Sequence, residues 1–215
     1  LQNHPQWTID THRFTGETPL GPKEFTNIIA TWSPLPSNNP KFTKPENEKR
    51  VVIAAHYDSK LFDFEFLAAT DSAVSCALLL DVIRSLGDEF EHYALHKSAK
   101  INSQLSFQII FFDGEEAFID WTDTDSIYGS KELAKKWKES DEEFERNPEN
   151  AESRKRNGIK NIELFILLDL IGAKDPVPQF RSYFSNTKEE FLRFSALEAQ
   201  LVRQNLYDLT NVPQS

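Results

Sequence analysis

The stretch LSFQIIFFDG, residues 105–114, is an almost unbroken apolar run that ends in an acidic residue. Two other runs have the same form: VVIAAHYD at 51–58 and IELFILLDLIG at 162–172. Such runs are typical of strands buried on both faces, as in the centre of a parallel or mixed sheet. A further strand is predicted over residues 25–33, where FTNIIATWS is rich in β-branched and aromatic residues.

Helical periodicity separates these strands. Apolar residues recur at intervals of three and four, which predicts helices over residues 71–86, 126–137 and 187–206. Residues 89–104 and 139–158 are predicted to be excursions, the second an exposed loop because it has almost no apolar residues. The alternation predicts an α/β fold, a three-layer αβα sandwich around a central mixed, mostly parallel sheet.

The charge and the apolar runs of the chain argue against a nucleic-acid partner and against a membrane span. The net charge of -10 and the pI of about 5.0 argue against nucleic acid, whose phosphates would be repelled. No apolar run approaches the roughly 20 residues that a membrane span needs. The one cysteine, Cys76, cannot form a disulfide within the chain.

Acidic residues follow the predicted strands, and in open α/β sheets chemistry gathers beyond the carboxyl ends of the strands. Adjacent glutamates can be a solvated acidic turn, but many carboxylates on one rim need protons or a cation to neutralise them. Histidine and carboxylates without thiolate suit a catalytic zinc, and one of two adjacent glutamates can hold a metal while the other carries a proton. The residues at this rim are His56, Asp58, Asp71, Asp113, Glu115, Glu116 and Asp169.

Five segments occur in an order and spacing that resemble the glutaminyl cyclases, or glutaminyl-peptide cyclotransferases, which belong to the clan of zinc-dependent aminopeptidases. The resemblance extends from about residue 20 to residue 175. It rests on HYDSK (56–60), ATDSAVSCA (69–77), FFDGEEAF (111–118) followed by Trp121, DSIYGS (125–130) and LLDLIGA (167–173).

The resemblance implies an acyltransferase with an aminopeptidase-like fold and one zinc ion. Such an enzyme converts the N-terminal glutamine of a peptide, or more slowly glutamate, to pyroglutamate and releases ammonia. By matching motif, Asp71 and Glu116 would be zinc ligands and Glu115 the general acid and base. Asp169 would share a proton in a catalytic hydrogen-bond network, and Trp121 would form a wall of the substrate pocket.

The third zinc ligand of this family is a histidine far downstream, and no histidine follows the LLDLIG segment here. The chain also starts at Leu1 and contains no Met. We therefore expect residues 1–215 to be a single incomplete catalytic domain, truncated at both ends, that alone holds little zinc. Many members pair a cysteine with the residue matching Cys76, but Ala55 stands at that position.

Two other functions stay open. In the dizinc aminopeptidases, the residues matching His56, Asp71 and Asp169 hold a second metal ion; the surrounding motifs favour the cyclase, in which His56 would be structural. A non-catalytic interaction protein is the third reading, which the intact acidic residues oppose. The pair His92 and His96 has a helical spacing that could bind metal, but a surface helix is the preferred interpretation.

The resemblance also implies partners and location. The expected partners are peptides or proteins with an N-terminal glutamine, and the expected form is a monomer. The expected location is outside the cell or within the secretory pathway, although the sequence itself carries no secretion signal.

Overall fold

The computed structural model describes five ranges of the chain, and its residues fall into two compact units, Leu1–Gly172 and Ala173–Ser215. The assignment of residues 1–215 to one domain stays a prediction. The described ranges are 7–33, 48–97, 104–148, 158–171 and 185–206.

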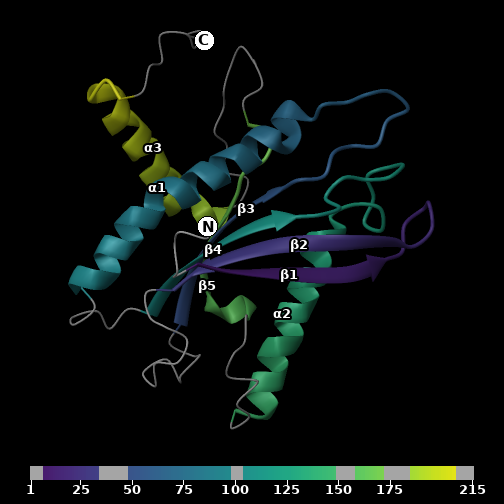
Figure 1. The fold of residues 1–215 in the computed structure, drawn as a ribbon, viewed down its shortest axis with the longest axis horizontal. Helices are drawn as coiled ribbons and strands as arrows, with labels where there is room; N and C mark the ends of the chain where they lie inside the picture. The colour runs from purple at the N-terminus through teal and green to yellow at the C-terminus, as the bar shows by residue number, and fades with distance from the viewer. Residues whose placement is uncertain (1–6, 34–47, 98–103, 149–157, 172–184, 207–215) are drawn as a thin grey trace. The chain divides into compact units, whose positions relative to one another are not determined.

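The first unit is built on a five-stranded mixed sheet with the order β1-β2-β4-β3-β5 (Figure 1). β3 pairs in parallel with both β4 and β5, whereas β2 is antiparallel to both β1 and β4. Among these strands, β2 therefore runs against the other four, and the predicted mixed, mostly parallel sheet is confirmed. The bounds are β1 (Trp7–Gly16), β2 (Lys23–Trp32), β3 (Glu48–His56), β4 (Gln104–Phe112) and β5 (Ile162–Leu167).

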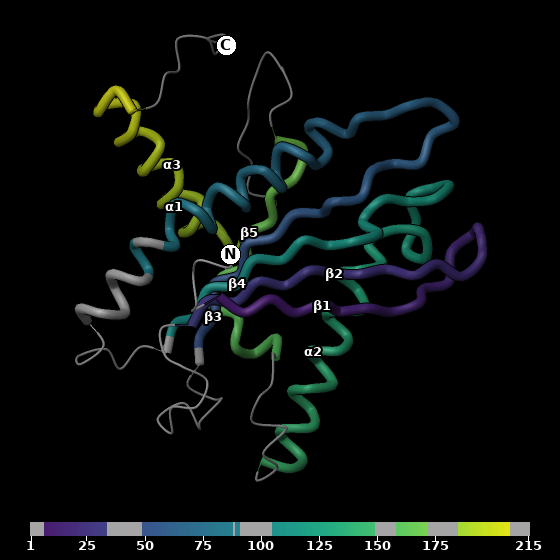
Figure 2. Tube along the Cα trace, in the orientation of Figure 1, coloured from purple at the N-terminus to yellow at the C-terminus, as the bar shows by residue number. Residues whose placement is uncertain are grey.

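Two helices cover the two faces of this sheet (Figures 1 and 2). On one face, Leu79 and Ile83 of α1 (Val74–Lys97) pack with Trp32 and other strand residues. On the opposite face, Leu133 and Trp137 of α2 (Tyr128–Arg146) pack with a second set of strand residues. The predicted three-layer αβα arrangement is confirmed.

Consecutive strand residues explain the unbroken apolar runs. Ala55 belongs to the core under α1 and Ala54 to the core under α2, and Ile109 and Ile110 divide in the same way. Because neighbouring side chains point to opposite faces of a strand, a sheet covered on both faces needs apolar residues at every position. The central strands were predictable for this reason.

Three boundaries differ from the sequence-based expectations. β1 was not predicted; it is an edge strand whose side chains are mostly exposed, so it has no apolar run. Residues 139–146 were predicted to be loop, but α2 continues to Arg146. Residues 89–97 were predicted to leave the helix, but α1 continues to Lys97; the side chains of His92 and His96 lie outside the described residues.

The second unit contains α3 (Lys188–Arg203), which confirms the last predicted helix. A 3₁₀ turn, η6 (Ser185–Thr187), precedes it. Two further short turns lie in the first unit: η3 (Ala69–Ala73) before α1 and η5 (Ile159–Asn161) before β5.

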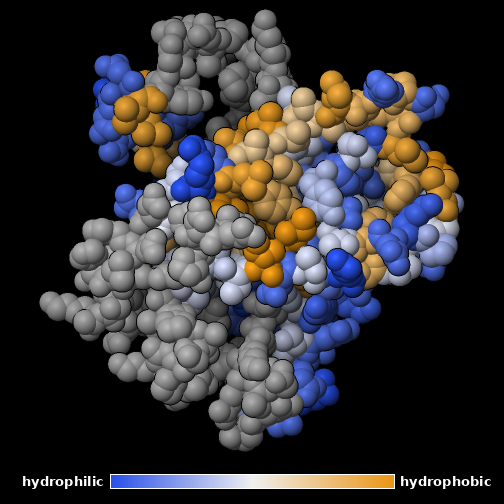
Figure 3. All heavy atoms as spheres, in the orientation of Figure 1, coloured by the Kyte–Doolittle hydropathy of each residue, from blue (hydrophilic) through white to orange (hydrophobic). Residues whose placement is uncertain are grey.

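The surface is polar along α2, at the lower right of Figure 3, and apolar over other parts of this face. Three exposed phenylalanines lie in the segment that comes after β3 in the sequence. The ring centroid of Phe62 is 4.8 Å from that of Phe64, which it stacks on, and 5.1 Å from that of Phe66, which it meets edge-on. Within the described ranges, no helix combines the length and apolar character needed to cross a membrane.

Adjacent leucines of α1 give a test of this packing. Leu79 is fully buried against the sheet, whereas Leu80 is 57% exposed. We expect Leu79→Ala to lower the free energy of unfolding by about 2 to 5 kcal/mol, because it leaves a cavity in the core. Leu80→Ala should change it by less than about 0.5 kcal/mol. Urea denaturation measures both variants, and equal losses would contradict the placement of α1.

Candidate active site

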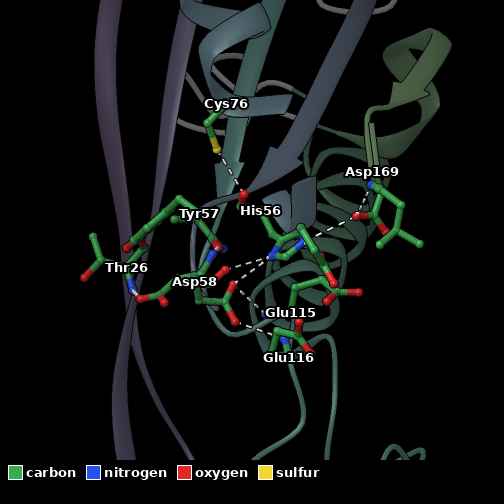
Figure 4. A network of polar contacts seen from close by, with 12 residues as sticks. Thr26, His56, Tyr57, Asp58, Cys76, Glu115, Glu116 and Asp169 are labelled. Atoms are coloured by element: carbon green, nitrogen blue, oxygen red, sulfur yellow. Dashed lines mark hydrogen bonds and ion pairs between the residues drawn. The ribbon is translucent and has the colours of Figure 1, made fainter. Parts of the chain in front are cut away.

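Three parallel strands bring their carboxyl ends to one edge of the sheet. β3 ends at His56, β4 at Phe112 and β5 at Leu167. The register pairs His56 with Phe112, so the segments that follow these two strands leave the sheet at the same level. The predicted gathering of acidic side chains at this edge is present (Figure 4).

His56 lies at the centre of this edge, and its side chain is 2% exposed. Its Nε2 atom is 3.0 Å from Asp71 Oδ1 and 3.3 Å from Asp169 Oδ1. Its Nδ1 atom is 3.4 Å from Asp58 Oδ1 and 3.2 Å from the backbone oxygen of the same residue. One imidazole therefore contacts carboxylates from three separate segments.

Burial alone would lower the pKa of His56, because it disfavours the charged imidazolium. Hydrogen bonds to Asp169 and Asp58 and the negative charge of Glu115 outweigh burial and raise the pKa to about 11. The hydrogen bond from His56 lowers the pKa of Asp169. Burial would raise the pKa of Asp58, but hydrogen bonds from His56 and from the backbone of Glu116 and Glu115 bring it below its ordinary value. The imidazolium thus supplies one positive charge among these acids.

Glu115 and Glu116 are held through their backbone. The Glu115 N–H donates to Asp58 Oδ1 at 3.0 Å, and the Glu116 N–H donates to Asp58 Oδ2 at 2.9 Å. Burial raises the pKa of Glu115 to about 7, and the charge of Asp169 adds to the rise. Burial and the charge of Asp71 raise the pKa of Glu116. A carboxyl group with a pKa near 7 can both accept and release a proton at neutral pH.

Within the described ranges, one group of side chains could hold a metal ion: ligand atoms of His56, Asp71 and Asp169 all lie within 4.8 Å of one another. A nitrogen and carboxylate oxygens fit a divalent ion such as zinc. All three residues were predicted at this rim; Asp71 was assigned as a metal ligand and Asp169 as a proton-sharing residue, and His56 was interpreted as structural. Glu116, predicted as a ligand, is outside this group, although the charge of Asp71 raises its pKa.

Asp113, which also follows β4, has a different role. Its Oδ2 atom accepts the Thr26 N–H at 2.7 Å, and its own N–H donates to Asn27 Oδ1 at 3.0 Å. The Tyr57 hydroxyl donates to the Thr26 carbonyl at 2.7 Å on the same side (Figure 4). Asp113 therefore ties the end of β4 to β2.

Trp121 lies in the loop that follows the two glutamates and is 59% exposed. Its role as a wall of a substrate pocket stays a prediction. Sequence reasoning assigned no role to the residues that hold this loop, Lys60 and Asp125, or to Asp58. These three residues lie within the HYDSK and DSIYGS segments, but nothing in the sequence indicates which groups they bind.

Comparison with known proteins places the fold in a family. Residues 27–212 match peptidase family M28. The chain therefore belongs to peptidase family M28. Its relatives within that family are glutaminyl cyclases, which confirms the resemblance drawn from the motifs.

Two curated relatives show the extent of the match. The chain is 41% identical over 208 residues to the glutaminyl-peptide cyclotransferase of Gloydius blomhoffii, covering 94% of this chain and 50% of that protein. It is 38% identical over 196 residues to the glutaminyl-peptide cyclotransferase of Bos taurus, covering 89% and 48%. The chain thus spans about half the length of the curated relatives it matches.

Solved structures agree with this assignment. The glutaminyl cyclase of Macrostomum lignano superposes with a TM-score of 0.68 at 31% identity, covering 97% of this chain and 57% of that one. The glutaminyl cyclase of an Acidobacteriales bacterium superposes with a TM-score of 0.53 at 28% identity, covering 85% and 48%. The α/β fold with a mixed sheet is therefore the fold of these enzymes.

Proposed function

We propose that the protein containing this chain is a zinc-dependent glutaminyl-peptide cyclotransferase. It converts the N-terminal glutamine of a peptide, and more slowly glutamate, to pyroglutamate with release of ammonia. The observation that carries the proposal is the placement of Glu115: Asp58 fixes its backbone, and its carboxyl group has a pKa of about 7 beside the acidic group around His56.

The donor set of the site fits zinc. Zinc in catalytic sites takes about three nitrogen, oxygen or sulfur ligands and keeps one position open. Asp71 and Glu116 would hold the ion, together with a histidine supplied by the full-length protein. Cys76 is not among the proposed zinc ligands. Its thiol donates to the His56 carbonyl at 3.0 Å, and its role in the helix is structural. A bound zinc ion would supply Lewis-acid polarisation of the substrate's side-chain carbonyl.

The chemistry assigned to the chain's own residues is proton transfer. The α-amine of the substrate glutamine attacks its own side-chain carbonyl carbon, so a new C–N bond forms within one molecule. Glu115 takes a proton from that amine and gives it to the departing amide nitrogen, which leaves as ammonia when the old C–N bond breaks. Asp169, hydrogen-bonded to His56, would share a proton and limit the negative charge beside Glu115.

Trp121 would line the pocket in this proposal. An aromatic wall excludes water, and exclusion of water suits the reaction because no water is consumed. The substrates would be peptides or proteins with a free N-terminal glutamine. We also propose that the enzyme acts as a monomer in the secretory pathway or outside the cell, as inferred from the family resemblance.

A zinc aminopeptidase is the second candidate, and one observation favours it. The group formed by His56, Asp71 and Asp169 is the set that would hold a second metal ion in such an enzyme. The cyclotransferase relatives at 36 to 41% identity weigh against it. An inactive interaction protein is weaker still, because buried acids cost stability unless they serve a purpose.

Product analysis separates these candidates. The full-length protein is incubated with a peptide that starts with glutamine and, separately, with a leucine arylamide. The cyclotransferase is expected to release ammonia and a pyroglutamyl peptide from the first and to leave the second intact. Release of free leucine would support the aminopeptidase, and inertness toward both substrates would support the interaction protein.

A further inference from the structure

The loop that carries the two glutamates is closed on itself at its base. The Tyr128 N–H donates to the Gly114 carbonyl at 2.7 Å, and the Ile127 N–H donates to the Glu115 carbonyl at 2.8 Å. Residues 114–128 thus leave the end of β4 and return to the start of α2 at the same place. We call this segment the glutamate loop. Such compact loops, whose ends are close, are frequently functional.

Asp125 is buried, with 3% of its surface exposed, and its carboxylate binds other residues of the glutamate loop. Its Oδ1 atom accepts the Phe118 N–H at 2.8 Å and the Tyr128 hydroxyl at 2.7 Å. Its Oδ2 atom accepts the Ile119 N–H at 2.8 Å and the Asp120 N–H at 3.1 Å. Burial would raise the pKa of Asp125, but these four hydrogen bonds lower it to about 2, so the carboxylate stays ionised at neutral pH.

Lys60 holds the same piece of backbone from the other direction. Its Nζ atom donates to the Ala117 carbonyl and lies 3.5 Å from the Ile119 carbonyl. Asp125 therefore holds the N–H groups of residues 118–120, and Lys60 holds the carbonyls of Ala117 and Ile119. This stretch joins Glu116 to Trp121, and it contains no helix or strand of its own.

We propose that Asp125 is a positioning residue that sets the orientation of Trp121 relative to the two glutamates. Trp121 directly follows the last N–H that Asp125 binds. The exposed indole has little surrounding core to fix it, so its direction depends on the backbone on both sides of it. Thr122, which follows Trp121, pairs with the backbone of Asp125, and a change of the Asp125 side chain keeps that pairing and releases only the backbone before the indole. The base of the loop has its own bonds, from Tyr128, Ile127 and Asp58, so the glutamates should keep their place when Asp125 is altered.

Asp125→Asn is the sharpest test because of how the four bonds divide. Each carboxylate oxygen accepts two of them. In asparagine one oxygen becomes an NH₂ group. At the Oδ2 position this donor would face the N–H groups of Ile119 and Asp120; at the Oδ1 position it would face the Phe118 N–H, although the Tyr128 hydroxyl could turn to accept from it, so either orientation opposes at least one backbone donor. Tyr128→Phe removes one of the four bonds and leaves the three backbone bonds. It gives a milder version of the same change if the first variant folds poorly.

Asp141→Asn is the matched control. Asp141 is also a buried aspartate, on α2, and its Oδ2 atom accepts the Lys160 N–H at 3.1 Å. The change removes the same charge from a buried carboxylate that binds backbone, but outside the glutamate loop. It therefore reports the general cost of such a substitution.

Fluorine NMR of the full-length protein labelled with fluorotryptophan tests the proposal and does not require the protein to be active. This chain has four tryptophans, of which Trp7, Trp32 and Trp137 are buried. The resonance that disappears from the full-length protein in Trp121→Phe is assigned to Trp121. We expect Asp125→Asn to shift and broaden the Trp121 resonance, Tyr128→Phe to do so less, and Asp141→Asn to leave it unchanged. An unchanged Trp121 resonance in Asp125→Asn would overturn the proposal.

Kinetics add a second readout, which rests on the proposed cyclotransferase function. If Trp121 contacts the substrate, Asp125→Asn should raise KM about tenfold and change kcat less than about threefold. A fall in kcat with KM unchanged would mean that Asp125 acts through the glutamates and would overturn the proposal. If the wild-type protein forms no pyroglutamate, the proposed function fails, and the fluorine spectra still decide whether Asp125 positions Trp121.

Discussion

Glu115→Gln is expected to lower kcat for pyroglutamate formation by a factor of about 100 to 10,000, the usual contribution of a general acid–base group. Glutamine keeps the size of the side chain and can still hydrogen-bond, but it cannot take the proton from the substrate amine. The backbone N–H at this position would still bind Asp58, so the loop should keep its conformation. Steady-state kinetics with a glutamine peptide measures the effect.

Two further measurements show whether the loss of kcat comes from proton transfer by Glu115. Glu163→Gln, on β5, changes an exposed glutamate that pairs with Lys49 at 2.9 Å, and it should leave kcat within about twofold. Zinc affinity should be unchanged in Glu115→Gln, because the residue is assigned to proton transfer. A kcat within threefold of wild type would contradict the role of Glu115, and a loss of zinc would reassign it as a ligand.

Asp71→Asn is expected to weaken zinc binding by more than about 100-fold, because losses in the shell around the ligands already cost 10- to 100-fold. The change removes a negative charge from the donor set and replaces the carboxylate beside His56 Nε2 with a neutral amide. The measurement is competition with a coloured zinc chelator, using the full-length protein. Asp81→Asn is the control, since Asp81 is an exposed α1 residue paired with Arg84. Unchanged affinity in Asp71→Asn would contradict the site.

The same assay separates the two possible ligand sets. If Asp71 and Glu116 hold a single ion, Glu116→Gln should lose zinc and His56→Gln should retain it. If a second ion lies among His56, Asp71 and Asp169, wild-type protein should bind two equivalents of zinc and His56→Gln only one. The second outcome would support the aminopeptidase.

The sequence predicted the centre of the fold because the central strands carry their signal locally. Residues 51–55 of β3 and 109–112 of β4 are apolar at every position, because helices cover both faces of the sheet there. The prediction that β5 is also buried on both faces was wrong: in the described part of the sheet it is an edge strand, and its side chains alternate between half-buried and exposed. β1 gives no such signal, because at the edge of the sheet its pairing with β2 stabilises it more than burial does. The final turns of α2, after Trp137, contain one apolar residue, Phe144. Good helix formers and ion pairs such as Lys138 with Glu142, at 3.9 Å, maintain the helix there.

Part of the site was also predictable, because some of its residues directly follow buried strands in the sequence. Acidic residues after buried strands pointed to the right edge of the sheet, and Asp71 and Asp169 do meet there. The central place of His56 between them was not predicted, because three segments far apart in the sequence create it. The part that Asp58 and Asp125 play in holding backbone N–H groups was also invisible, since a carboxylate that binds backbone and one that binds metal look the same in sequence.

The most direct test of the account is the reaction of the full-length protein with a glutamine peptide in water enriched in heavy oxygen. If the amine of the substrate attacks its own side-chain carbonyl, the product is a pyroglutamyl peptide that carries no heavy oxygen, and ammonia is released in equal amount. A product that has taken up heavy oxygen, whether a glutamyl peptide or a free amino acid, would show that water is the nucleophile. That result would contradict intramolecular cyclisation at this site.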